Sequence, residues 1–153
     1  GLDQYAANLA QSTESSDGFS NSLRIEGTTP ETTIESGEYF RIQHRLEAQS
    51  LQHLGFGSSS AKSITISFWV RSSLPGAYAF HIYQNDTGDI VTSRYNITSA
   101  DTWEYKTFTY SGNTGGAINN DNGQGLVLNW ILDVNAAFTA ESGLGANWDD
   151  YNG

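Results

Sequence analysis

The sequence contains no cysteine, no methionine and only two prolines, and positively charged residues are scarce. Without cysteine, disulfide bonds cannot cross-link the fold, and a thiolate metal site is excluded. Seven Lys and Arg stand against 17 Asp and Glu, which gives a formal net charge of −10. Because a nucleic-acid-binding protein needs a basic surface to neutralise phosphates, this balance predicts that nucleic acid is not a partner.

Long apolar runs are also missing. No run approaches the length of a membrane span, so we expect no membrane insertion. The chain is instead rich in Ser, Thr and Asn and has 16 glycines, and its 153 residues fit one domain. This polar but weakly charged composition is typical of secreted β-sandwiches and virion proteins, whose turns need such residues.

The most regular pattern lies over residues 63–73. Apolar side chains share one parity, at Ile64, Ile66, Phe68 and Val70. The other parity carries Thr65, Ser67, Trp69 and Arg71. A period of two predicts a strand with one buried face. We expect Trp69 to point away from the core, where either a second layer covers its ring or a ligand binds it.

Shorter alternating segments surround this strand. They lie at residues 23–26, 77–83, 90–97, 103–110 and 126–134. Turn signals such as Pro75-Gly76 and Asn85-Asp86-Thr87-Gly88 separate them. Trp130 falls on a core-facing parity. Strands at short spacing with no intervening amphipathic helix predict an all-β fold, an antiparallel β-sandwich.

Three segments give weaker signals. Residues 39–54 favour an extended strand, with a helix as the rival because leucines recur there and Gly and Pro are missing. Residues 1–17 have a weak helical pattern, and we expect 1–18 to be a linker or partner-docking segment ahead of a domain at 19–153. Trp103 is interpreted as a lid over the sandwich end and Trp148 as an interface anchor.

Two stretches resemble jelly-roll carbohydrate-binding modules of the family four and nine type. They are Glu47-Ala48-Gln49-Ser50-Leu51-Gln52-His53-Leu54 and the run from Ala61 to Ser72 that includes Ser67-Phe68-Trp69-Val70. Residues 95–107 and the loop Asn119-Asn120-Asp121-Asn122-Gly123 are similar to segments of virion proteins of marine bacteriophages. The resemblance runs from about Phe19 to the C-terminus. It implies a jelly roll, yet the closing strand usual in such domains is missing.

The resemblance implies a virion protein, either a tail fibre, a spike or a capsid decoration protein. Its expected partners are other virion subunits, in a homo-trimer, and host surface glycan. The alternative is a carbohydrate-binding module excised from a secreted polysaccharide-degrading enzyme. No cofactor is expected, although modules of this type often carry structural calcium. Asn119–Asn122 offers oxygen ligands but lacks the spaced carboxylates of a calcium loop, so a polar hairpin is the preferred interpretation.

In a sandwich, the residues that alternate away from the core are expected to lie together on one face. They are Gln43, Arg45, Glu47, Trp69, Arg71, His81, Tyr83, Arg94, Asn129, Ile131 and Asp133. Sugar binding needs a ring that stacks on a pyranose and polar groups that pair with hydroxyls. The predicted glycan ligands are Trp69, Arg71, His81, Tyr83, Arg45, Asn129 and Asp133. The simpler alternative is that the N-terminal segment or a neighbouring subunit covers the rings.

Catalytic residues are not expected. Glu47 and Asp133 could form the carboxylate pair of a glycosidase, but acidic chains supply such pairs by chance and neighbouring arginines could neutralise them. No nucleophile elbow is present. The histidines, His44, His53 and His81, are spaced unlike a metal site.

Overall fold

The computed structural model describes residues 6–29, 39–134 and 147–150. Its strands are β1 (Ala6–Ser12), β2 (Ser22–Thr29), β3 (Tyr39–Glu47), β4 (Ile64–Val70), β5 (Gly76–Gln84), β6 (Asp89–Ile97), β7 (Glu104–Tyr110), β8 (Gln124–Val134) and β9 (Asp149–Asp150). One 3₁₀ helix, η1 (Ala48–Leu54), follows β3. All strand pairs are antiparallel, as the alternating patterns predicted.

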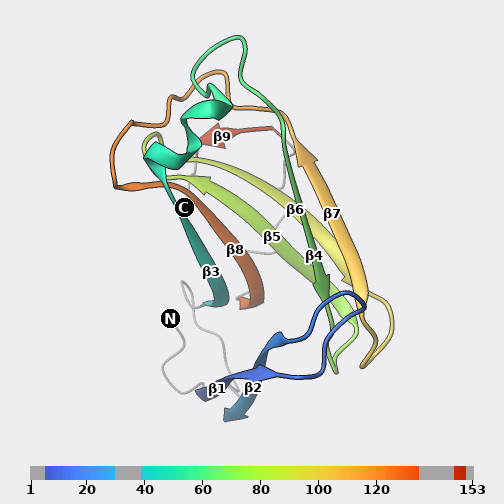
Figure 1. Ribbon diagram of the computed structural model, residues 1–153. Coiled ribbons are helices and arrows are strands. Elements are labelled where there is room, and N and C mark those ends of the chain that lie inside the picture. The colour runs from blue at the N-terminus through green and yellow to red at the C-terminus, as the bar shows by residue number, and fades with distance from the viewer. Residues whose placement is uncertain (1–5, 30–38, 135–146, 151–153) are drawn as a thin grey trace.

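The strands form two facing layers. A five-stranded sheet has the order β3-β8-β5-β6-β9, and β4 pairs with β7 in a two-stranded sheet that lies across it (Figure 1). The Phe68 ring of β4 meets Phe80, Tyr95 and Trp130 of the larger sheet, with centroids 5.4–5.9 Å apart. These contacts confirm the antiparallel β-sandwich and place Trp130 against the core, as the sequence predicted.

Helix η1 corrects the expectation that residues 39–54 are extended throughout. The strand ends at Glu47, after a register shift between Leu46 and Glu47. Ala48, Leu51 and Leu54 are buried, and their spacing of three matches the three residues per turn of a 3₁₀ helix. Gly55 ends the helix in the left-handed region at φ 63°.

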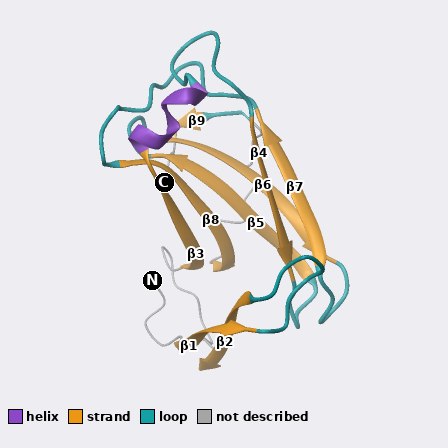
Figure 2. Cartoon of the chain, in the orientation of Figure 1, coloured by secondary structure: helices purple, strands orange, loops and turns teal. Residues whose placement is uncertain are grey.

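The weak helical pattern near the N-terminus is also wrong for residues 6–12. They form β1, which pairs with β2 from Ala6↔Thr29 to Ser12↔Ser22. This hairpin lies at one end of the sandwich, away from η1, and among the described elements its strands contact chiefly each other (Figure 2). The division of the chain at residue 18 stays a prediction.

The edge of the larger sheet next to β6 is a short strand, β9. β9 pairs with Asp89 and Ile90 of β6. Residues 135–146 and 151–153 lie outside the described residues, so the prediction about a closing strand there stays a prediction.

Candidate functional site

The predicted ligand residues lie on two opposite faces of the sandwich. Phe68 points into the core, so its neighbour Trp69 projects from the outer side of the β4–β7 sheet. Phe80 and Trp130 point into the core from the other layer, so His81 and Asn129 project from the outer side of the five-stranded sheet. The expectation of one common face is therefore wrong, because the strands belong to different layers.

The outer side of the five-stranded sheet carries three cross-strand rows. From β3 through β8 and β5 to β6 they read Arg41–Ile131–Ala79–Arg94, then Gln43–Asn129–His81–Thr92, then Arg45–Val127–Tyr83–Ile90. We call these twelve positions the arginine face. Antiparallel register places residues of one row side by side on the same surface.

A chain of side-chain hydrogen bonds crosses this face. Gln43 Nε2 donates to Asn129 Oδ1 at 2.9 Å, and Arg45 Nε donates to Gln43 Oε1 at 2.8 Å. Asn129 Nδ2 donates to the Val127 carbonyl at 3.2 Å. Asn129 is only 1% exposed, so it holds Gln43 in place rather than reaching a ligand itself.

His81 is largely buried on this face. Burial, and secondly the charge of Arg41, lower its pKa from 6.5 to about 4. The imidazole is therefore neutral near pH 7, when one ring nitrogen donates and the other accepts. The Arg41 guanidinium lies over the Tyr39 ring, 4.4 Å from its centroid.

Four more of the residues predicted to face outward lie on or next to this side of the sheet. Tyr83 is half-buried, and Arg94 is exposed on β6. Asp133 faces Phe40 in the β3–β8 register, and its side chain lies outside the described set. Glu47 is exposed and pairs with Gln124 beyond the register shift.

The outer side of the β4–β7 sheet carries an aromatic pair. Trp69 faces Tyr105 across the two strands, with ring centroids 5.3 Å apart and planes at 54°. Both side chains are exposed, at 39% and 53%. Hydroxyl pairs continue the same surface: Ser67 faces Thr107, and Thr65 Oγ1 bonds Thr109 Oγ1 at 2.9 Å. We call these six residues the Trp69 surface.

Tyr105 was missed among the candidate ligands. It shares a parity with exposed Thr107 and Thr109, so alternation alone places it outward. Only the β4–β7 register brings its ring beside Trp69, and that pairing joins residues 36 positions apart in the chain.

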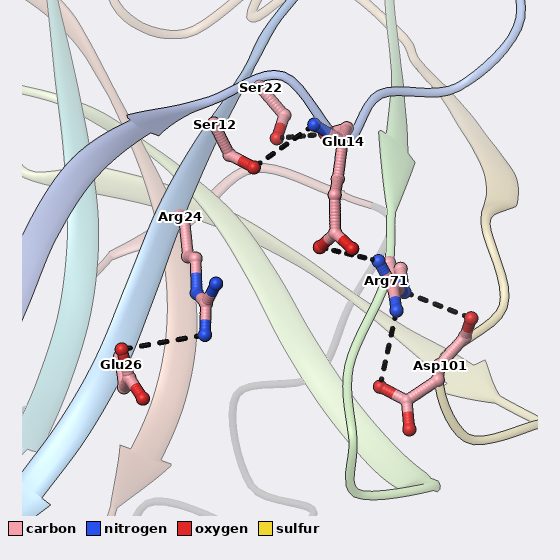
Figure 3. A network of polar contacts seen from close by, with 7 residues as sticks. All are labelled: Ser12, Glu14, Ser22, Arg24, Glu26, Arg71 and Asp101. Atoms are coloured by element: carbon pink, nitrogen blue, oxygen red, sulfur yellow. Dashed lines mark hydrogen bonds and ion pairs between the residues drawn. The ribbon is translucent and has the colours of Figure 1, made fainter.

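Arg71, predicted as a sugar ligand, is used within the molecule (Figure 3). Its Nη1 donates to Glu14 Oε2 at 2.9 Å, and its Nε donates to the Asp101 carbonyl at 2.9 Å. Asp101 Oδ1 lies 3.6 Å from Arg71 Nη2. Arg71 therefore ties the N-terminal hairpin to the loop that precedes β7.

The loop considered for calcium is held by the protein's own groups. Asn119 donates to the Asp86 carboxylate through its backbone N–H, at 2.9 Å, and through Nδ2, at 2.7 Å. Asp121 Oδ1 accepts from the Gly123 N–H at 2.9 Å. Among the described residues, no cluster of three or more His, Asp or Glu is placed to hold a metal ion.

Trp148, predicted as an interface anchor, makes two contacts within its own chain. Its Nε1 donates to the Ser111 carbonyl at 2.7 Å, and its ring meets Phe56 edge-on at 5.4 Å. This contact fixes the segment that leads into β9 against the η1 end of the sandwich. Whether Trp148 also contacts a neighbouring subunit stays a prediction.

These observations define the class of the protein as an all-β antiparallel sandwich with two chemically different outer faces. No family model matches the sequence, and neither a curated protein nor a solved structure matches it. In the described ranges, no helix is long and apolar enough to cross a membrane.

Proposed function

We propose that this chain is a bacteriophage virion structural protein, a tail fibre, spike or capsid decoration protein, whose jelly-roll-type sandwich contacts host surface carbohydrate. The Trp69 surface is the observation that carries the glycan-binding part. Aromatic rings bind the C–H face of a pyranose, and neighbouring hydroxyls pair with sugar hydroxyls. Trp69, Tyr105, Ser67 and Thr107 supply both kinds of group on one exposed surface.

The N-terminal hairpin supports the assembly part of the proposal. An isolated two-stranded hairpin is at best marginally stable in water. Leu9 and Leu23 are nevertheless 66% and 56% exposed on β1 and β2, and Phe19 in the turn is 62% exposed. Neighbouring subunits of a homo-trimer would bury these side chains and stabilise the hairpin.

The glycan contact is tested by titrating the protein with soluble neutral polysaccharides, a glucan and a xylan, while following tryptophan fluorescence. We expect a spectral shift with the native chain and at least a tenfold weaker affinity in Trp69→Ala, about 1.4 kcal/mol. His53→Ala is the control, because it removes an exposed ring from η1, which lies at the end of the sandwich away from the hairpin (Figure 1). Undiminished binding by Trp69→Ala would exclude this surface.

The second candidate is a carbohydrate-binding module from a secreted polysaccharide-degrading enzyme. The same aromatic pair favours it equally, since both functions need a sugar-binding surface. The two differ in assembly: a virion subunit self-associates, whereas an excised module sediments as a monomer that still binds glucan.

A further inference from the structure

The arginine face has a charge opposite to that of the whole molecule. Three of the chain's seven cationic residues, Arg41, Arg45 and Arg94, lie on it. None of its other positions is acidic, although the chain has 17 Asp and Glu and a net charge of −10. The twelve positions therefore carry positive charge on an otherwise acidic molecule, and Asp133 on β8 and Asp149 opposite Ile90 border them.

Neighbouring side chains on β3 orient Arg41 and Arg45. The bond from Arg45 Nε to Gln43 fixes the plane of an exposed guanidinium. Arg41 is half-buried against the Tyr39 ring. Ion pairs between described residues involve Arg24, Arg71 and Lys106, and none joins a described carboxylate to Arg41 or Arg45.

We propose that the arginine face binds an acidic polysaccharide, with Arg41 and Arg45 holding its carboxylate or sulfate groups. A guanidinium presents paired donors that match a carboxylate or sulfate in a bidentate geometry. Strand geometry separates the two Cα atoms by about 13 Å, so they meet charges on different sugar units. Gln43, half-buried, lies between them and binds hydroxyls.

A polymer with both charges and hydroxyls fits this arrangement better than an acidic protein. The middle row consists of uncharged polar groups, and a peptide rich in Asp or Glu has no hydroxyls for them. Nucleic acid fits poorly, because the rest of the surface is strongly acidic.

The test measures binding of polygalacturonate and dextran sulfate by calorimetry at low salt, with unmodified dextran and poly-L-glutamate as comparison probes. We expect the acidic polysaccharides to bind, and binding to weaken as added salt screens the charges. The double variant R41Q/R45Q should lose at least tenfold in affinity. R24Q is the matched control, because Arg24 lies on the hairpin and its removal changes the net charge in the same direction.

Three outcomes would overturn the proposal. The first is that neither acidic polysaccharide binds. The second is that R24Q and R41Q/R45Q lose affinity to the same extent. The third is that poly-L-glutamate binds as tightly as polygalacturonate. The two surfaces are tested with different probes: neutral glucan tests the Trp69 surface, and salt-dependent binding of acidic polysaccharide tests the arginine face, which lies on the opposite layer. Failure at the Trp69 surface is thus distinguishable from failure at the arginine face.

Discussion

At the scale of single residues, His81 and Glu104 show how local contacts set protonation. Burial lowers the pKa of His81 to about 4. The hydrogen bond from Lys106, followed by bonds from Thr98, lowers the pKa of Glu104 to about 2. Glu104 Oε1 accepts from the Thr98 N–H at 2.7 Å and from the Ser99 N–H at 3.1 Å, so this carboxylate holds the loop before β7.

The depressed pKa of His81 predicts a pH-dependent stability. Between pH 6.5 and 4 the unfolded chain binds a proton at His81 that the folded chain does not, so the free energy of unfolding falls as pH decreases. The full effect is about 3 kcal/mol, reached near pH 4. His81→Gln should remove this part of the fall in urea denaturation at a series of pH values.

The matched control for this measurement is His44→Gln, which removes an exposed imidazole from β3. This variant keeps His81 and should therefore keep the fall in stability that His81 causes. Glu104 does not affect the comparison, because its stabilisation, which is lost progressively as pH falls from its unfolded pKa of 4.5 to about 2, is the same in all of these variants. Parallel profiles for the native chain and His81→Gln would contradict the assignment.

At the scale of elements, η1 packs on β8 only because residue 125 has no side chain. A Cβ on Gly125 would lie 2.8 Å from Ala48 Cα and 2.9 Å from Leu51 Cδ1. The backbone N–H groups of Ala48 and Gln49 donate to the carbonyls of Gly123 and Asp121, at 2.9 and 2.8 Å. The helix is thus bonded to the loop before β8 and cannot shift freely.

Gly125→Ala should therefore destabilise the fold by roughly 1–3 kcal/mol, as overpacking in a close-packed core does. Thermal denaturation would show this as a lower Tm. Gly76→Ala is the control, since a Cβ there meets nothing within 4 Å. A Tm for Gly125→Ala equal to that of Gly76→Ala would mean that η1 can move away from β8 without loss.

At the scale of the whole molecule, the exposed hairpin predicts self-association. If Leu9 and Leu23 contact neighbouring subunits, the native chain sediments as a trimer. The double change Leu9→Ser with Leu23→Ser should give a folded monomer, because both side chains lie outside the sandwich core. Leu74→Ser controls for loss of an exposed leucine elsewhere.

Sedimentation velocity over a range of concentrations checks this prediction. A native chain that stays monomeric while binding glucan would favour the excised carbohydrate-binding module. Dissociation by Leu74→Ser to the same extent would show that the hairpin is not the contact.

The alternation of residue types determined much of the fold. Period-two patterns identified the strands over 77–83, 90–97 and 126–134 and put Phe80, Ile82 and Leu126 inside, each at most 1% exposed. They also put Trp69 and His81 outside. These features were predictable because side-chain direction in a strand depends only on local backbone geometry.

Only the tertiary structure decided on which of the two outer faces of the sandwich each outward residue lies. Trp69 and His81 both alternate away from the core, but β4 and β5 belong to different sheets, so the two residues project in opposite directions. Sheet membership depends on pairing between distant segments, such as Trp69 with Tyr105, which no local pattern encodes. The same holds for η1: leucines recur over residues 39–54, but the change from strand to helix at Ala48 accompanies close packing of the helix against Gly125, which no local pattern encodes.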